Sequence, residues 1–397
     1  MLYLPKGAEA LLIAIQTPNF RGTIGIPVLL WGKPGEGKSS FLESLSQPNF
    51  PVLTLIASIH DPTDFSGLPI MHEGKVRYAI PEWVEGFGEE GEGILFLDEL
   101  TTAPPSVQAA LLRVVLERKV GFHDLPEKVR IVSAANPPDL MTGGWELSPP
   151  LRNRFVHLSW ELPAQVYKNA LLNGYEKASL PLIPKEAHSK ALQEYQLLIH
   201  GFLDRNPNLL TSSPETDRYG FASPRSWDYA AALMASCDVL NLSPLKSDQT
   251  STVFLELLAG CVGDGIATNF VGFLKNLKLP NPQEVLDGKI KVILKDLNES
   301  ELFILFNGFQ QYLKKGTDES LFIKRSLVLI PLIDEVVAAN RKDIIFPAIR
   351  TLAKKEFLMA RLIKATLEQP KVNKEVMDFI NRFFSEKAFE EYVNLLG

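Results

Sequence analysis

The feature that most constrains this chain is a glycine-rich segment that follows an apolar run near the N-terminus. Residues 32–39 read GKPGEGKS and match the pattern G-x-x-x-x-G-K-[ST] at every defined position. The apolar residues 24–31 predict a strand before this segment, and residues 39–45 have helical spacing after it. A strand, this loop and a helix, in that order, form a site for the phosphates of a nucleoside triphosphate. The competing interpretation is a chance glycine-rich turn, and the flanking strand and helix count against it.

The segment also suggests a role for each of its side chains. Its glycines let backbone N–H groups converge on phosphate oxygens, and the start of the helix adds partial positive charge. Lys38 is expected to reach the β- and γ-phosphates, and the Ser39 hydroxyl to ligate Mg²⁺. We therefore expect ATP with Mg²⁺ to bind at Gly32, Pro34, Gly35, Glu36, Gly37, Lys38, Ser39 and Ser40.

A second acidic motif follows a short, fully apolar strand. Residues 94–97 read ILFL, and Asp98 and Glu99 come directly after them. The carboxyl ends of strands in an open α/β sheet are where ligands bind, so both acids are expected beside the phosphate loop. Asp98 is placed to hold Mg²⁺ through water, and Glu99 to act as general base on the attacking water. The competing interpretation is a strand that ends in a solvated acidic pair.

Four further polar side chains are candidates with open alternatives. Asn136 ends the strand segment predicted over 129–136, where it could orient the lytic water, touch the γ-phosphate or simply form a turn before two prolines. Arg152 and Arg154, in LRNRF, are either surface charges or a finger for a neighbouring subunit's γ-phosphate. Arg225 follows Pro224 at a helix start and either stays at the surface or reaches the nucleotide.

The order of patterns along the chain predicts the fold. Strand-like and helix-like segments alternate over the first 160 residues, which predicts an α/β parallel sheet with helices on both faces. Helical patterns follow, including one over 251–269 and others over 299–315, 321–339, 347–369 and 374–396. We therefore expect three domains: an α/β nucleotide-binding domain at 1–162, a helical lid at 163–278 and a helical C-terminal region at 279–397.

Composition excludes several classes of protein. The net charge is -6 and the pI about 5.7, which argues weakly against a general polyanion binder. The two cysteines, Cys237 and Cys261, form no metal-ligand pattern and fit a reducing cytosol. No apolar run reaches the ~18 residues of a membrane helix. We expect a soluble, cytoplasmic protein without membrane insertion.

Taken in order, these motifs resemble the AAA+ ATPases, and within them the MoxR-like, dynein-related subgroup. The resemblance covers residues 20–240 and implies a P-loop AAA+ sheet followed by an all-α lid. It implies Walker A at 32–39, Walker B at 94–99, sensor 1 at Asn136, an arginine finger at Arg154, and sensor 2 at Arg225. Arg152 remains an alternative finger. Residues 61–83 and 118–126 are similar to two insertions that face the central pore of such rings.

The resemblance implies an ATPase that works as a hexameric ring. Three functions are considered for it. The first is a chaperone-like ATPase that remodels, activates or assembles a protein partner, such as one with a von Willebrand factor A-type domain. The second is a nucleic-acid-stimulated translocase or defence ATPase, with candidate basic residues at Lys75, Arg77, Arg118 and Lys119. The third is a scaffold that binds ATP only to assemble.

Overall fold

The computed structural model divides the chain into two compact units. The first comprises Met1–Ile199 and Asn206–Lys275, and the second His200–Arg205 and Asn276–Gly397. The structure describes residues 4–20, 22–88, 91–137, 139, 144–175, 177–215, 219–246, 251–277, 280–314, 319–341, 343–345, 374 and 378. Apart from positions 374 and 378, the helices expected over 347–369 and 374–396 lie outside these residues. The three domains expected from the sequence stay a prediction.

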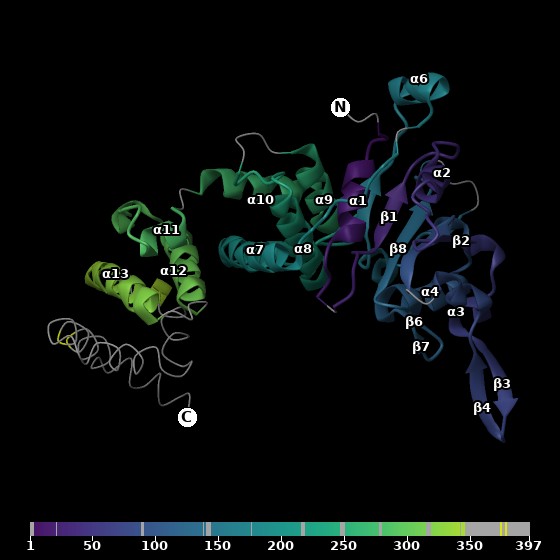
Figure 1. The fold of residues 1–397 in the computed structure, drawn as a ribbon, viewed down its shortest axis with the longest axis horizontal. Coiled ribbons are helices and arrows are strands. Elements are labelled where there is room, and N and C mark those ends of the chain that lie inside the picture. Colours follow the sequence, from purple (N-terminus) through teal and green to yellow (C-terminus); the bar gives the residue numbers. More distant parts are fainter. Residues whose placement is uncertain are drawn as a thin grey trace. The chain divides into compact units, whose positions relative to one another are not determined.

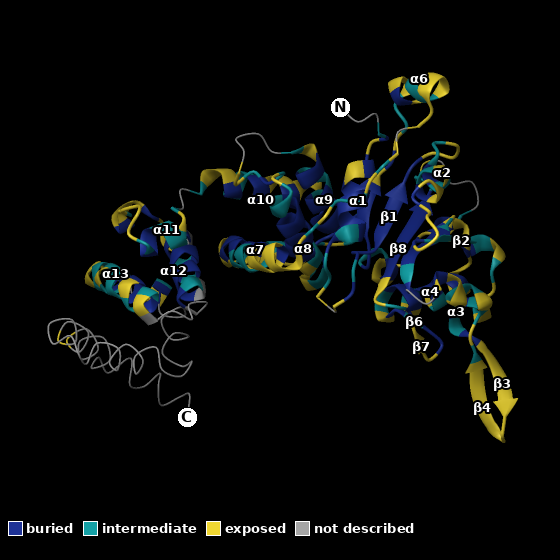
Figure 2. Ribbon diagram, in the orientation of Figure 1, coloured by how far each residue is buried: buried dark blue, intermediate teal, exposed yellow. Residues whose placement is uncertain are grey.

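A five-stranded parallel sheet forms the centre of the first unit (Figure 1). Its strand order is β2-β5-β8-β1-β9. The strands are β1 (Val28–Trp31), β2 (Val52–Ile56), β5 (Glu92–Asp98), β8 (Lys128–Ala135) and β9 (Val156–Ser159). All four residues of β1 and the central residues of β5 are buried, as expected for strands covered on both faces (Figure 2).

Helices cover both faces of this sheet. On one face, α4 (Pro105–Glu117) packs Leu111 into a cluster with Leu29 and Leu95. On the other, α1 (Ala8–Gln16) and α9 (Thr252–Val262) contact β9 and each other. The predicted α/β parallel sheet with helices on both faces, followed by helices, is confirmed.

Two antiparallel hairpins extend from the α/β part. The first pairs β3 (Leu68–His72) with β4 (Lys75–Ala79), after the short helix α3 (Thr63–Ser66). It projects beyond the sheet, and nearly all its side chains are exposed (Figure 2). The second pairs β6 (Lys119–Val120) with β7 (His123–Asp124). Both hairpins fall within the segments that resembled insertions.

The helical part of the first unit departs from the sequence prediction at one point. The single helix predicted over 251–269 is wrong: α9 ends at Val262 and α10 (Asp264–Asn276) begins after Gly263. Gly263 has φ of 90°, a left-handed conformation that ends a helix and that only glycine adopts readily. The other α-helices of this part are α2 (Lys38–Glu43), α5 (Pro149–Arg152), α6 (Ala164–Asn173), α8 (Pro224–Val239) and most of α7 (Lys185–Arg205), whose residues His200–Arg205 belong to the second unit.

The second unit is helical and has a core of its own. It contains α11 (Pro282–Leu286), α12 (Glu299–Lys314) and α13 (Glu319–Ala338). Leu302, Phe306 and Phe309 of α12 lie at the centre of its apolar cluster. The predicted helices over 299–315 and 321–339 are confirmed with small shifts at their ends. Among the described residues of the chain, no helix has the length and apolar character needed to cross a bilayer.

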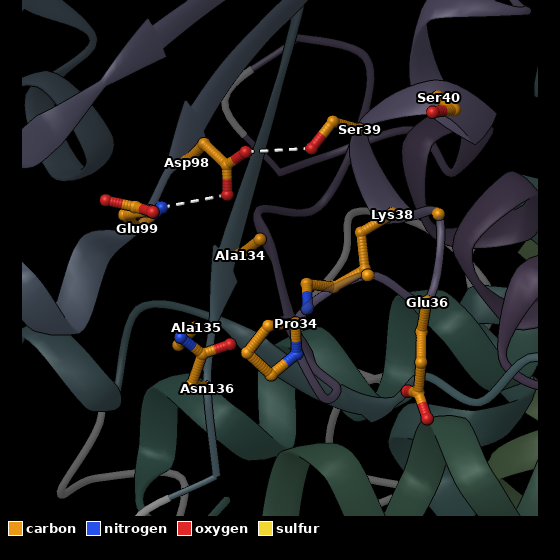
Figure 3. A pocket seen from close by; sticks show the side chains of 12 residues that line it. Pro34, Glu36, Lys38, Ser39, Ser40, Asp98, Glu99, Ala134, Ala135 and Asn136 are labelled. Carbon is orange, nitrogen blue, oxygen red and sulfur yellow. Dashed lines mark hydrogen bonds between the residues drawn. The ribbon is translucent and has the colours of Figure 1, made fainter. Parts of the chain in front are cut away.

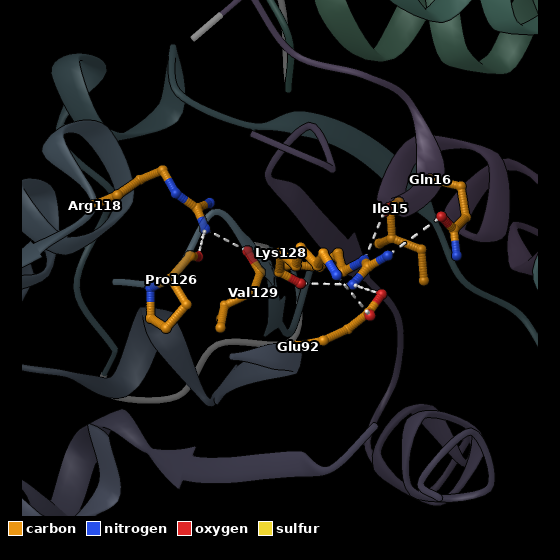
Figure 4. Close-up of polar contacts among 8 residues, drawn as sticks. Ile15, Gln16, Glu92, Arg118, Pro126, Lys128 and Val129 are labelled. Carbon is orange, nitrogen blue, oxygen red and sulfur yellow. Dashed lines mark hydrogen bonds and ion pairs between the residues drawn. The ribbon is translucent and has the colours of Figure 1, made fainter. Parts of the chain in front are cut away.

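Arg130, on β8, holds the first helix of the chain against the sheet (Figure 4). Its guanidinium donates to the Ile15 carbonyl at 3.2 Å, to Gln16 Oε1 at 3.3 Å and to Glu92 Oε1 at 2.8 Å. The residue is only 2% exposed, and this burial lowers its pKa, while Glu92 opposes the shift. The arginine therefore joins the end of α1 to β5 and β8.

Candidate functional site

The two predicted motifs meet at one cavity of about 320 Å³ at the carboxyl edge of the sheet (Figure 3). It is lined by Pro34, Gly35, Glu36, Gly37, Lys38, Ser39, Ser40, Asp98, Glu99, Ala134, Ala135 and Asn136. Three parallel strands, β1, β5 and β8, end here, and residues at or just beyond the end of each strand line the cavity. The parallel topology thus brings together segments that lie far apart in the sequence.

The glycine-rich loop has the conformation that its glycines permit. Gly35 has φ of 79° and Gly37 φ of 75°, and neither position has an atom within 4 Å of a built Cβ. The limit at both positions is therefore the left-handed backbone rather than space. Gly32 differs: a Cβ there would lie 2.8 Å from the Trp160 carbonyl oxygen, so close approach of the backbone requires glycine.

Lys38 folds back onto the loop that carries it. Its Nζ donates to the carbonyl oxygens of Gly32 at 2.6 Å and Lys33 at 3.0 Å. The residue is 8% exposed, and burial lowers its pKa, while the charges of Asp98 and Glu36 oppose the shift. A buried ammonium with only carbonyl partners and two nearby carboxylates is suited to exchange those partners for phosphate oxygens.

Ser39 and Asp98 supply oxygen ligands at adjacent positions. The Ser39 hydroxyl donates to Asp98 Oδ2 at 2.8 Å, and Asp98 Oδ1 accepts the Glu99 backbone N–H at 2.9 Å (Figure 3). A hydroxyl beside a carboxylate is the hard oxygen donor set that Mg²⁺ selects, with water and phosphate completing its shell. The side chains present at this edge of the cavity fit the expected metal.

Glu99 is exposed and is held by two hydroxyl groups. Its backbone is left-handed, with φ of 55°, a conformation unusual for a non-glycine residue. Ser58 Oγ donates to Glu99 Oε2 at 3.2 Å, and Thr102 Oγ1 lies 3.5 Å from the same oxygen. Ser58, just beyond β2, was missed in the sequence. The only available signal was its position after the strand that neighbours β5.

Asn136 lies across the cavity from the phosphate loop. It follows β8 directly and is half-buried at the lining of the cavity. The preceding residue, Ala135, accepts the Gly32 backbone N–H at 3.3 Å, which joins the end of β8 to the start of the loop. Asn136 therefore shares the cavity with the phosphate loop, and its role toward the γ-phosphate or the attacking water remains a prediction.

The two candidate finger arginines contact backbone carbonyls of their own chain. Arg152 is half-buried and donates to the carbonyl oxygens of Pro214 at 3.1 Å and Tyr219 at 2.7 Å. Arg154 is 8% exposed, and its guanidinium donates to the Pro150 carbonyl. Among the described residues, those that line the cavity include neither arginine.

Arg225 lies in the first turn of α8, whose start is capped by Ser223 and Ser226. Its guanidinium donates to Asn153 Oδ1 at 3.3 Å, between the two candidate finger arginines. The described lining of the cavity does not include Arg225. Its expected role toward the nucleotide remains a prediction.

Two tryptophans, which the sequence did not single out as functional, brace the phosphate loop. Trp160 donates its indole N–H to the Glu36 carbonyl at 3.0 Å, and its ring lies 5.0 Å from that of Phe41. Trp31, immediately before Gly32, donates its indole N–H to His157 Nδ1 at 2.9 Å. Both contacts tie the loop to β9 and its end, and no local sequence pattern signals either of them.

Comparison with known proteins places the cavity within a described family. Residues 27–155 match the model of the AAA domain (dynein-related subfamily). Over 149 residues the chain is 32% identical to the Psp operon transcriptional activator of Escherichia coli, covering 32% of this chain and 42% of that protein. Over 226 residues it is 24% identical to chaperone MoxR1 of Mycobacterium tuberculosis, covering 54% of this chain and 58% of that protein.

A solved structure aligns with more than half of the chain. A full-length MCM homolog from Methanopyrus kandleri aligns with a TM-score of 0.37 and 16% identity, covering 68% of this chain and 56% of that one. The chain spans about half the length of the two relatives named above.

Proposed function

The chain is a MoxR-like member of the AAA+ family, with its AAA domain at residues 27–155, and from this premise we propose that it is a Mg²⁺-dependent ATPase. One observation carries the proposal. A single cavity is lined by a lysine, a hydroxyl, two carboxylates and an amide at Lys38, Ser39, Asp98, Glu99 and Asn136. These are the groups that hydrolysis of a phosphoanhydride requires.

Each side chain has a part in the reaction. Lys38 leaves the carbonyls of Gly32 and Lys33 and binds the β- and γ-phosphate oxygens. Ser39 and Asp98 would hold Mg²⁺, which would neutralise charge on the phosphate oxygens. Glu99 accepts the proton of the attacking water, and Asn136 orients that water.

We propose that the active form is a hexameric ring in which Arg154 completes the site of the next subunit. An arginine supplied in trans stabilises the charge of the transition state and is worth roughly 10³–10⁵ in rate. To reach a neighbour, Arg154 would exchange its contact with the Pro150 carbonyl for a phosphate oxygen. Arg152 donates to the carbonyls of Pro214 and Tyr219 of its own chain. The place of Arg154 in LRNRF, which the resemblance assigns to the finger, favours Arg154.

The ring would remodel, activate or assemble a protein partner, as a chaperone does. In this scheme residues 1–162 hydrolyse ATP, the lid at 163–278 moves with hydrolysis, and residues 279–397 form a platform for the partner or an extension of the lid. A partner with a von Willebrand factor A-type domain is the candidate that the family suggests. The exposed apolar side chains of the first hairpin, with Met71 at 72% and Val76 at 60%, support contact with protein.

The alternative, an ATPase stimulated by nucleic acid, finds support at the first hairpin only. His72, Lys75 and Arg77 share one face of it near its tip, by the register of β3 and β4. At the second hairpin, Arg118 is buried and donates to the carbonyls of Pro126 and Val129, so it braces the hairpin instead of facing outward (Figure 4). Lys119 is paired with Asp124 at 2.6 Å.

The deciding experiment compares phosphate release by the wild type and Glu99→Gln. We expect the variant to bind ATP with unchanged affinity and to lose turnover, because a glutamine cannot accept the proton. Equal, measurable rates would mean that the assigned chemistry is wrong. Absence of turnover in both proteins would favour a scaffold that binds ATP only to assemble. Adding single-stranded DNA, RNA or a purified von Willebrand factor A-type protein then separates the two functions by which of them raises the rate.

A further inference from the structure

His157, at the centre of β9, is buried between the phosphate loop and the segment that carries the two candidate finger arginines. It is 4% exposed, and both of its ring nitrogens are used. Nδ1 accepts the Trp31 indole N–H at 2.9 Å, and Nε2 lies 2.9 Å from the Arg152 carbonyl oxygen. One side chain therefore contacts the residue before Gly32 and the end of α5.

These two partners fix the tautomer and the protonation state of the imidazole. An indole N–H can only donate and a carbonyl can only accept, so Nδ1 is bare and Nε2 carries the hydrogen. Burial lowers the pKa of His157 to about 4, which agrees with a neutral ring. A protonated ring would set two N–H groups against each other at Trp31.

The Arg152 carbonyl, which accepts the hydrogen bond from His157, lies at the C-terminal end of α5. Arg152 is the last residue of α5, and its carbonyl accepts the Phe155 backbone N–H at 3.2 Å in addition to the His157 ring. The hydrogen bond from His157 fixes the position where the chain leaves the helix toward Asn153 and Arg154. The direction of Arg154 is thus set from β9.

Tyr219 closes the arrangement from the other side. Its ring stacks on Trp31 with centroids 4.8 Å apart, and its carbonyl accepts the Arg152 guanidinium at 2.7 Å. Side chain and backbone of Arg152 are therefore both anchored to groups that touch Trp31. A displacement of Trp31 would therefore shift the segment 152–154.

We propose that His157 is a positioning residue, which holds the finger segment of its own subunit in the geometry that serves the site of the next subunit. This inference rests on the proposed ring ATPase and adds to it a residue that contacts neither nucleotide nor metal. Its effect would appear in the neighbour's turnover and leave nucleotide binding in its own subunit unchanged.

Two substitutions separate the two contacts of the ring. In His157→Asn, Oδ1 stands near the place of Nδ1 and can still accept from Trp31, while the Arg152 carbonyl loses its side-chain donor and keeps only the Phe155 backbone N–H. In His157→Gln, the amide nitrogen stands near the place of Nε2 and can still donate to that carbonyl. We expect His157→Asn to lower kcat about 10- to 100-fold at unchanged nucleotide affinity, and His157→Gln to stay within a few-fold of the wild type.

Mixed rings provide the decisive measurement. His157→Asn is mixed with Glu99→Gln before ATP is added, so that the second protein supplies an intact finger without hydrolysing. We expect phosphate release well above the sum of the separate rates, because intact sites of the first protein now receive the second protein's Arg154. Mixing His157→Asn with Arg154→Ala is the matched control and should give no gain.

Each outcome bears on one claim. No gain over the sum with Glu99→Gln, or equal losses in His157→Asn and His157→Gln, would overturn the positioning role. Loss of nucleotide binding by His157→Asn would also overturn it, because the residue would then only maintain the fold. A wild-type protein without ATPase activity would overturn the proposed function itself, which the mixed rings do not address.

Discussion

The Ser39 hydroxyl donates a hydrogen bond of 2.8 Å to the Asp98 carboxylate at the cavity. These two groups would hold Mg²⁺, Ser39 directly and Asp98 through water. The contact thus links the first turn of α2 to the end of β5 and couples metal binding to both motifs.

The first prediction concerns that pair. Asp98→Asn should lower turnover on the order of 10²–10³-fold, because a neutral amide binds Mg²⁺ more weakly than a carboxylate and the charge of the transition state is then less stabilised. Excess EDTA should abolish wild-type turnover, and added Mg²⁺ should restore it. Phosphate release measures both effects, with Asp296→Asn on an exposed turn of the second unit as control. Full activity of Asp98→Asn would contradict the assigned metal site.

The second prediction separates the two arginines. Arg154→Ala should lower kcat about 10³-fold, since its role is in the neighbour's transition state. Arg152→Ala should instead cost about 2–3 kcal/mol in the free energy of unfolding, because it removes charged donors from the carbonyls of Pro214 and Tyr219. Urea unfolding and phosphate release on both variants check this. A reversed pattern would make Arg152 the finger.

The third prediction concerns pH. The pKa of His157 is about 4 in the folded chain, against 6.5 for an exposed imidazole, so the unfolded state binds the proton more readily. The stabilisation is fully present above about pH 6.5 and is lost as pH falls toward 4, amounting to about 3 kcal/mol. Urea unfolding of wild type and His157→Gln across this range should show the wild type losing its advantage in acid. Parallel curves would refute the assignment.

The fourth prediction tests how α9 lies on the sheet. A Cβ on Gly260 would stand 2.2 Å from the His157 carbonyl oxygen and 3.0 Å from Val156 Cγ2. Gly260→Ala should therefore destabilise the first unit by about 1–3 kcal/mol. Gly272→Ala, in α10 with open space around it, should stabilise by roughly 0.5–1 kcal/mol. Equal melting temperatures for the two variants would mean that α9 does not cross β9 closely.

The cavity was predictable because its parts are local motifs placed by a simple topology. Gly32–Ser39 and Asp98 each follow a buried apolar run, and parallel strands end at one edge, so the meeting of the motifs needs no knowledge of side-chain packing. The break at Gly263 was not predictable in the same way, because apolar spacing continues on both sides of it and a helical glycine is tolerated.

Contacts between distant segments could not be predicted from the sequence. Trp31 and His157 are separated by 126 positions, and nothing in either neighbourhood marks the other. Arg118 looked like an exposed basic residue of a hairpin, yet it is buried because two backbone carbonyls accept its guanidinium. Such pairings depend on three-dimensional proximity, which periodicity and motif spacing do not encode.

The anchoring of α1 by Arg130 has a consequence for the order in which the chain folds. Ile15 and Arg130 are 115 positions apart, and Thr17 at the other side of this helix end bonds Ser236 across 219 positions. During synthesis, α1 leaves the ribosome long before either partner exists. Closing such long loops costs conformational entropy and slows folding. The docking of α1 therefore waits for segments that are made much later, and until then the apolar surface that it covers stays exposed.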